Sequence, residues 1–505
     1  MSFNSLDFLL LFAAVVILYY LLPQKLRNPL LLIASYVFYA AYNLGLTLFL
    51  LVLTLVTYFI GREVDRRRGD KASKRWMILG VTLNLLVLAF YKYFNFFSLT
   101  IAGLTGAADP VRIDWLVPLG ISFIVFTAVS YLADVYRGKL SSQPSLFKFA
   151  LYISFFPKIV QGPIERAGDI LPQFEEAHVF DLKRYREGMI YVLYGLFMKM
   201  VVADTASIVV DRIYGSLNDY SGAAIALATV LFALQIYCDF AGYSYTAIGA
   251  AKVLGFEFRQ NFRQPYLSRS VAEFWRRWHM SLNRWLTDYL YIPLGGSRCS
   301  KSRKNFNVLV TFGLSGLWHG ADWGYVIWGL LNGIYIIVES ALKSFSARLR
   351  AGRSASEAKE AASPSAGKQR LGSFLHGFIT FILIAFSWIF FRARNLSTSF
   401  TAIGRIFTQF HLLSFIGYVR EQLAGGAGTS LYGLDVVYNL PVLLAGIVTV
   451  VIVDVMTDRR SIAKELAEGR RWLRWLVSLA LIFAVILFGV YGYGYSAGAF
   501  IYAGF

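Results

Sequence analysis

Long apolar runs recur from one end of the chain to the other, and they limit the fold more than any other feature. Many of them approach or exceed the length that an α-helix needs to cross a bilayer. The period-two alternation of a membrane β-barrel is missing. The sequence therefore predicts an all-α polytopic membrane protein with about twelve crossings and both termini outside. The expected spans are 5–22, 29–43, 45–60, 76–98, 117–135, 188–213, 222–252, 305–319, 324–342, 372–391, 439–457 and 473–492.

Positive charges lie mainly in short segments between these runs. The formal net charge is +19, which in a soluble chain would indicate nucleic acid as a partner. Here Lys and Arg gather in stretches such as 61–75 and 459–474, a pattern typical of cytoplasmic loops and of contact with anionic lipids. We therefore expect membrane lipids, and no nucleic acid, among the partners.

Two stretches interrupt the pattern of spans. Residues 143–187 are interrupted by Pro157, Pro163 and Pro172, so we expect re-entrant or interfacial pieces there instead of one span. Residues 343–371 are rich in Ala, Ser and charges, which predicts a flexible cytoplasmic loop. The chain is then a single membrane domain, 1–505, in four parts: N-terminal helices (1–140), a core with re-entrant and basic segments (141–342), the flexible loop (343–371) and C-terminal helices (372–505).

Two of the five histidines have unusual surroundings. His279 follows a basic, Trp-rich segment, and His319 stands inside an apolar stretch between Trp318 and Gly320. A ring that titrates near neutral pH is costly among apolar residues unless it has a partner or a task. For His319, a structural histidine bonded across helices and a functional one are equally supported by the local sequence. No close ligand spacing joins any two histidines, so the sequence predicts no metal site.

The segment before His279 predicts a basic, aromatic helix. On a helix, Trp275, Trp278 and His279 would share one face by their i+3 and i+4 spacing. Arg276 and Arg277 could then meet the phosphates of an anionic donor. An interfacial helix with snorkelling arginines and Trp anchors explains the arginines better, and both interpretations can hold together.

Four further residues are candidate substrate contacts: Asp239 within the run 222–252, Trp318 next to His319, Trp278 directly before His279, and Asn283 shortly after it. A carboxylate inside a span is a functional candidate by default, although an interhelical hydrogen bond explains Asp239 about as well. Residues 494–498 match the G-x-S-x-G pattern of serine nucleophiles. They have neither a strand before them nor a helix after them, so we treat the match as chance.

Several short motifs point together to one family. They are Gln161–Ile164 (QGPI), Asp239–Phe240 with Gly242–Ser244 (DF and GYS), Asn261–Phe262 (NF), Pro265–Leu267 (PYL), Glu273–His279 (EFWRRWH), Asp288–Gly296 (DYLYIPLGG) and Leu317–Gly320 (LWHG). In these residues the chain resembles the membrane-bound O-acyltransferase family. It is most similar to the bacterial branch that acylates envelope polymers, such as the membrane subunit of alginate O-acetyltransferase. The resemblance runs to about residue 335 and is weaker beyond it.

This resemblance implies that His319 is the principal catalytic residue and His279 the second histidine of the site. It also implies a central funnel or tunnel through the membrane, which joins a cytoplasmic acyl donor to an extracytoplasmic acceptor. The chain departs from the pattern of the branch at Ala241, Tyr245 and Asn332, where Ser, Asp and His are frequent. These changes leave the histidine pair intact and bear on the acceptor and the detail of the site.

The expected function is that of a membrane O-acyltransferase, in the first place an O-acetyltransferase, in the bacterial cytoplasmic (inner) membrane. It would move an acyl group from a cytoplasmic thioester, acetyl-CoA or an acyl carrier, to hydroxyls of an envelope polysaccharide. Transfer would be direct or through a periplasmic acyltransferase partner in a biosynthetic complex, with no tightly bound cofactor. The alternatives are a transporter or flippase of lipid-linked glycans or acyl groups, against which the two histidine motifs stand, and a scaffold for a synthase.

Overall fold

The structure, a computed structural model, is helical almost throughout. It describes residues 1, 3–106, 109–351, 366–393, 395–425, 429–457 and 461–491, except for the side chains of 349–351 and 366–369. Eight of the described helices are long and apolar enough to cross a membrane, and α1 (Leu6–Leu21) and α6 (Ile121–Tyr136) are shorter apolar helices. The prediction of an all-α polytopic membrane protein is thereby confirmed.

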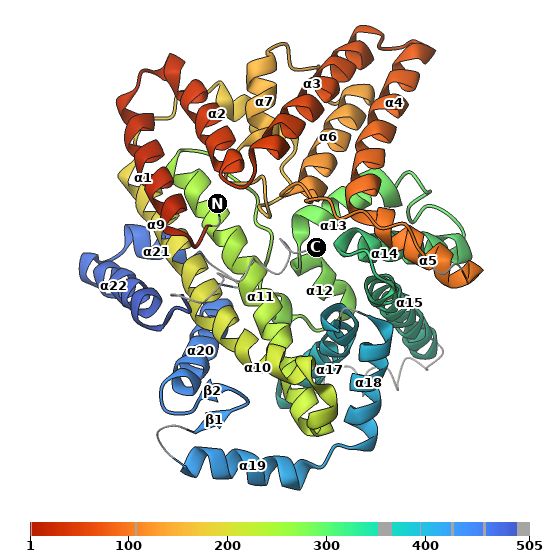
Figure 1. The fold of residues 1–505 in the computed structure, drawn as a ribbon, viewed down its shortest axis with the longest axis vertical. Coiled ribbons are helices and arrows are strands. Elements are labelled where there is room, and N and C mark those ends of the chain that lie inside the picture. Colours follow the sequence, from red (N-terminus) through yellow and green to blue (C-terminus); the bar gives the residue numbers. More distant parts are fainter. Residues whose placement is uncertain are drawn as a thin grey trace. The chain divides into compact units, whose positions relative to one another are not determined.

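The chain divides into two compact units. The first unit comprises Met1–Asp204, Tyr237–Gln260 and the described residues from Ser461 onward. Within it, α3 packs against α4, and both helices contact α6 (Figure 1). Its helices besides α1 and α6 are α2 (Gln24–Ala40), α3 (Leu44–Arg66), α4 (Lys71–Leu88), η1 (Ala89–Tyr93), α5 (Phe94–Thr105), α7 (Leu146–Ser154), α8 (Ala167–Ile170), η2 (Pro172–Phe174), α9 (Leu182–Leu196), η3 (Phe197–Ala203), α21 (Ile462–Glu468) and α22 (Arg471–Phe488).

The second unit comprises Thr205–Ile236 and the described residues of Asn261–Arg460. A short antiparallel hairpin, in which Leu431 pairs with Leu434, is its one strand pair among the described residues. The unit boundary falls inside α11 (Gly222–Val253). The other elements are α10 (Asp204–Gly215), η4 (Leu217–Asp219), η5 (Pro265–Leu267), α12 (Val271–Arg277), α13 (Met280–Leu286), η6 (Thr287–Tyr291), α14 (Lys301–His319), α15 (Trp323–Ala351), α17 (Ala366–Arg392), α18 (Leu396–Thr408), α19 (Leu412–Ala424), β1 (Ser430–Leu431), β2 (Leu434–Asp435) and α20 (Asn439–Thr457).

Polar residues at the helix starts explain where several apolar helices begin. Asn43 precedes α3, and its side-chain oxygen accepts a hydrogen bond from the Leu46 amide at 3.0 Å. Asp70 caps α4 in the same way through the Ala72 amide at 3.3 Å. Such caps satisfy backbone donors that the first helical turn leaves open. The helices therefore begin directly after their caps, at Leu44 and Lys71, one and five residues before the spans predicted to start at 45 and 76.

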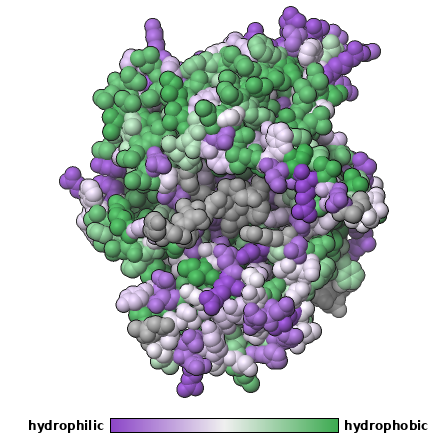
Figure 2. Space-filling view, viewed as in Figure 1, coloured by the Kyte–Doolittle hydropathy of each residue, from purple (hydrophilic) through white to green (hydrophobic). Residues whose placement is uncertain are grey.

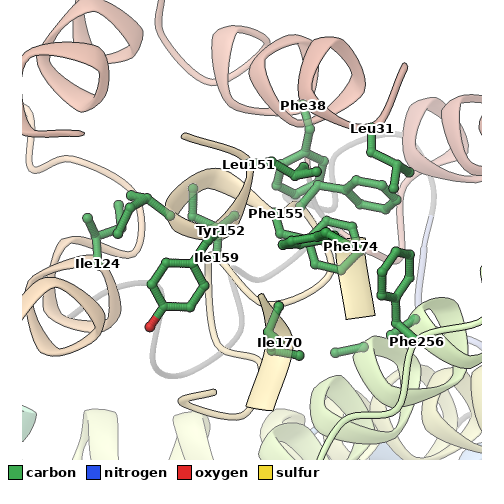
Figure 3. Packing of buried hydrophobic residues seen from close by; sticks show 14 of the residues in the cluster. Leu31, Phe38, Ile124, Leu151, Tyr152, Phe155, Ile159, Ile170, Phe174 and Phe256 are labelled. Carbon is green, nitrogen blue, oxygen red and sulfur yellow. The ribbon is translucent and has the colours of Figure 1, made fainter. Parts of the chain in front are cut away.

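The stretch after α7 is irregular and buried in the core of the first unit. The ring of Phe155 lies 5.4 Å from that of Phe174 and 5.1 Å from that of Phe256, measured between centroids, and Leu31 lies close by (Figure 3). The next helix, α8, begins only at Ala167. The prediction that residues 143–187 do not form one span is therefore confirmed.

The surface of the N-terminal helices is apolar. Figure 2 shows hydrophobic residues covering this face, with hydrophilic residues gathered where α3 connects to α4. Leu10, Ile33 and Leu48 are among the exposed apolar side chains of α1, α2 and α3. Contiguous exposed apolar area of this kind is unfavourable in water and suits contact with lipid chains.

One predicted loop is shorter than expected. Residues 343–351 continue α15, and residues 366–371 already belong to α17, so the prediction that all of 343–371 is a flexible loop is wrong at both ends. Helix formers such as Ala, Leu, Lys and Arg dominate these ends and let the helices extend beyond their apolar stretches. The remainder of this loop, and the G-x-S-x-G match at 494–498, lie outside the described residues.

Helices α14 and α15 form a tightly packed hairpin that carries His319 at its turn. A Cβ atom on Gly316 would lie 2.1 Å from the Tyr325 carbonyl oxygen, and one on Gly329 would lie 2.2 Å from that of Phe312. Only glycine permits so close an approach of two backbones. The two glycines thereby fix the position of the turn that ends α14.

Candidate active site

A sharp kink between two short helices positions His279. Helix α12 ends at Arg277, and α13 begins at Met280. His279 lies between them with φ 43° and ψ 54°, a left-handed conformation that non-glycine residues rarely adopt. The predicted continuous helix, with Trp275, Trp278 and His279 on one face, is therefore wrong.

The side chain of Asn261 holds the His279 ring. Asn261 Oδ1 accepts hydrogen bonds from the Ser281 amide at 3.3 Å and from Ser281 Oγ at 2.9 Å. The same oxygen lies 3.0 Å from His279 Nδ1. Because that oxygen acts as an acceptor, Nδ1 carries the proton and donates it, which leaves the lone pair on Nε2. The Met280 amide also donates to the Asn261 carbonyl at 2.8 Å, so the kink and the tautomer are fixed together.

His319 is the last residue of α14, and aromatic rings from three helices enclose it. Its ring centroid lies 4.9 Å from that of Trp318, 5.1 Å from Trp328 on α15 and 5.6 Å from Phe391 on α17. Trp328 in turn stacks on Trp388 of α17 at 5.3 Å. This aromatic cage excludes water, and electrostatic interactions inside it are stronger than in solvent.

The two imidazoles lie close together in the second unit. Their ring centroids are 6.4 Å apart, and Trp318 lies 6.1 Å from His279. The side chains of His279 and His319 are only 1% and 2% exposed. Burial lowers the pKa of His279 to about 3, so that this ring is neutral at physiological pH. In this conformation a substrate reaches either ring only if neighbouring side chains move.

Trp278 and Asn283 support the kink beside His279. The Trp278 ring packs against Phe262 at 5.0 Å and against Trp388 at 5.2 Å. Asn283 Nδ2 donates to the carbonyl oxygens of Trp275 and Trp278, at 2.7 Å for the latter, and so satisfies the open end of α12. These contacts give both residues a structural role, and substrate binding by them stays a prediction.

A small cavity lies one helical turn from His319. It has a volume of about 180 Å³, and its walls include Asn283, Thr311 and Ser315. Ser315 precedes His319 by one turn on α14. This is a place near the histidine pair where part of a ligand could lie.

The two arginines of the basic segment differ in their surroundings. Arg277 forms an ion pair with Glu273 one turn earlier, at 2.8 Å. Arg276 is exposed to solvent. The electrostatic attraction of Arg277 for a phosphate is thus partly neutralised by its own helix, and Arg276 is the better candidate for that task.

Asp239 belongs to the first unit and takes part in a buried ionic cluster. Its Oδ1 lies 2.5 Å from Lys199 Nζ, and the same ammonium lies 2.8 Å from Asp204 Oδ1. Helix α9 and α11 approach closely here, since a Cβ on Gly195 would lie 2.4 Å from the Gly242 carbonyl oxygen. The lysine gives the intramembrane carboxylate a structural partner, in line with the interhelical bond that the sequence left open.

Asn261, Trp328 and Trp388 also lie around the two histidines, although the sequence indicates no functional role for them, and so does Asn332, which the sequence marks only as a departure from the family pattern. Asn332 accepts from Trp275 Nε1 at 3.2 Å and donates to the Trp328 carbonyl at 2.8 Å, so the position where the branch frequently has His lies next to the aromatic cage. The only indication in the sequence that Asn261 belongs to the site is its position in one of the short family motifs. Tryptophans within apolar spans look the same whether they face lipid or the protein interior.

Comparison with known proteins agrees with the motifs. Residues 31–356 match the sequence profile of the membrane-bound O-acyltransferase family. The chain is 37% identical to a probable alginate O-acetylase of Pseudomonas aeruginosa, over 87% of this chain and 83% of that protein. It is 30% identical to a peptidoglycan O-acetyltransferase of Helicobacter pylori, over 79% and 78%. A teichoic acid D-alanyltransferase of Streptococcus thermophilus is 28% identical over 44% of this chain and 57% of that protein.

Proposed function

The chain belongs to the membrane-bound O-acyltransferase family, and from this premise we propose that it O-acetylates a polysaccharide of the bacterial cell envelope. The relatives that cover most of the chain act, by their names, on alginate and on peptidoglycan, which are both envelope polymers rich in hydroxyl groups. An acetyl group is the acyl unit that these names share. The membrane would be the bacterial cytoplasmic membrane.

The observation that carries the proposal is the pair of buried imidazoles, His279 and His319, with ring centroids 6.4 Å apart. At that separation both rings can act on one bound group once neighbouring side chains have moved. The hydrogen bond from His279 Nδ1 to Asn261 directs the lone pair to Nε2, as orientation of a substrate proton requires. Two titratable rings inside an aromatic cage are costly to bury, and chemistry explains their presence better than packing does.

In the proposed mechanism His319 acts as general base. It takes the proton of an acceptor hydroxyl while the hydroxyl oxygen forms a bond to the thioester carbonyl carbon. The tetrahedral intermediate collapses, the carbon–sulfur bond breaks, and the departing thiolate takes the proton back from the imidazolium. Such proton transfer typically contributes about 10²–10⁴-fold to a rate. His279, neutral in its buried position, would orient the donor or acceptor or relay the proton, and Trp318 would form one wall.

The donor and acceptor would approach from opposite sides of the membrane. We infer about twelve crossings, with re-entrant segments around a central funnel or tunnel that opens when side chains near the cavity at Ser315 move. A cytoplasmic thioester, acetyl-CoA or an acyl carrier, would supply the acyl group, with Arg276 attracting its phosphates. A periplasmic partner in a biosynthetic complex could receive the acyl group before the polymer does. No tightly bound cofactor is needed for this chemistry.

The test is transfer of radiolabelled acetyl groups by the purified protein in lipid nanodiscs. We expect His319→Gln to lower transfer to an oligosaccharide acceptor by at least about 10²-fold. His376→Gln is the matched control, because His376 is exposed on α17. Wild-type rates in a folded His319→Gln variant would remove the proposed role of His319. Labelled acetate on the protein or on a partner would distinguish relayed from direct transfer.

A further inference from the structure

An open groove of about 660 Å³ runs along one side of α17 in the second unit. Its walls include Arg370, Phe374, Phe378 and Phe381 from α17 and Tyr266 and Arg269 from the segment before α12. The proposed reaction assigns no role to this groove. It lies on the surface of a helix that is long and apolar enough to span a membrane.

The groove has the shape of a shallow channel along the helix axis. Arg370, Phe374, Gly377, Phe378 and Phe381 follow one another at spacings of three, four and one residues, so they form one stripe of α17. The missing side chain of Gly377 makes the hollow in this stripe. The eleven helical steps from Arg370 to Phe381, at about 1.5 Å each, give a length of about 16 Å, which is roughly half of a 30 Å hydrocarbon core. The channel therefore spans about one leaflet.

The two arginines lie at the same end of this channel. The segment that contains Tyr266 runs back along α17, because the Tyr266 ring lies 5.3 Å from Phe381 and the Ser268 carbonyl oxygen is 3.7 Å from the position of a Cβ on Gly377. Arg269 follows Ser268 and therefore lies toward Arg370. In the sequence, Arg370 directly precedes the apolar stretch of α17, so we expect both guanidinium groups at headgroup level.

The remaining walls favour a hydrocarbon chain over a soluble ligand. Phe374 and Phe378 are 68% and 55% exposed on an apolar span, so they face lipid chains. A cationic end at headgroup level, followed by an aromatic channel one leaflet long, matches a phosphate with an acyl tail. We propose that the groove binds an anionic phospholipid, whose phosphate contacts Arg269 and Arg370 and whose acyl chain lies over Gly377 against the phenylalanines.

The first arm of the test measures binding of phosphatidylglycerol and phosphatidylcholine to the full-length protein by native mass spectrometry. Arg269→Gln with Arg370→Gln should weaken phosphatidylglycerol binding by about 25-fold, at about fivefold for each basic residue. Arg471→Gln is the matched control, because Arg471 is the exposed first residue of another span. It should leave phosphatidylglycerol binding unchanged.

The second arm fills the channel without touching the charges. Gly377→Leu should prevent binding of both phospholipids, since a Cβ there meets only ordinary contact with protein and the larger side chain projects into the hollow. Gly372→Leu, at a position whose Cβ meets no atom within 4 Å, should bind like the wild type. This arm decides the question alone if the double arginine variant does not fold.

Two results would overturn the proposal. One is equal retention of phosphatidylglycerol by the wild type and by both groove variants. The other is that the groove variants lose affinity for coenzyme A thioesters and keep their affinity for phosphatidylglycerol, which would assign the two arginines to the acyl donor.

Discussion

The ionic cluster around Lys199 yields a prediction that separates a structural role of Asp239 from substrate binding. The cluster holds one positive and two negative side chains, and each of the three is at most 6% exposed. Lys199→Met leaves the carboxylates of Asp204 and Asp239 buried without a counter-charge, which should cost about 3–5 kcal/mol of stability. Asp239→Asn leaves one lysine facing one aspartate and should change stability by about 1 kcal/mol or less.

The assay compares thermal unfolding of the purified variants by tryptophan fluorescence with their acetyl-transfer rates. Lys148→Met is the matched control, because Lys148 pairs with Glu175 at 2.8 Å on the surface of the same unit, and such pairs contribute at most about 1 kcal/mol. A Lys199→Met variant as stable as the control would refute the reasoning. An Asp239→Asn variant with unchanged unfolding and no transfer would make Asp239 a substrate contact.

Three further predictions concern the site in the second unit. Asn261→Ala should lower the transfer rate constant roughly tenfold with little change in KM, because His279 loses the acceptor that fixes its tautomer; an unchanged rate would show that the tautomer does not matter. Asn283→Ala should destabilise the protein by about 1–3 kcal/mol, since two carbonyl oxygens at the end of α12 lose their donor, whereas a raised KM with normal unfolding would indicate substrate binding. In the folded protein the pKa of His279 lies below the ordinary value of about 6.5, so the unfolded chain binds more protons and the stability of the fold should decrease as the pH drops below about 6.5. His279→Gln should make the stability less dependent on pH in acid unfolding curves. Identical curves for the wild type and this variant would contradict the prediction.

Most helices of this protein can be predicted from its sequence. Hydropathy locates the cores of the spans because every segment in contact with lipid must be apolar and must satisfy its backbone hydrogen bonds internally. Prolines such as Pro157 mark where a helix cannot continue. The ends are less predictable. Capping residues such as Asn43 and Asp70 determine the starts of α3 and α4, and strong helix formers extend α15 to Ala351 beyond its apolar stretch.

The residue types of the candidate site can be predicted from the sequence, but their geometry cannot. The two histidine motifs indicate the proposed chemistry. The spacing around His279, however, predicts a continuous helix, whereas the structure has a left-handed kink that is held by a tertiary hydrogen bond to Asn261. Likewise, nothing in the local sequence of Asp239 shows that Lys199, forty residues earlier, is its partner. Long-range polar contacts override local propensity, and a single sequence does not record them.

The hairpin of α14 and α15 has a consequence for biogenesis. Its glycine contacts join residues close together in the sequence, so this pair can assemble as soon as both helices have left the ribosome. Phe391, one of the rings around His319, and Trp388, which stacks on Trp328, belong to α17 and are synthesised some seventy residues after His319. A nascent or truncated chain that ends before α17 would thus present an imidazole with one side open, and reactivity would be acquired only at a late stage of membrane insertion.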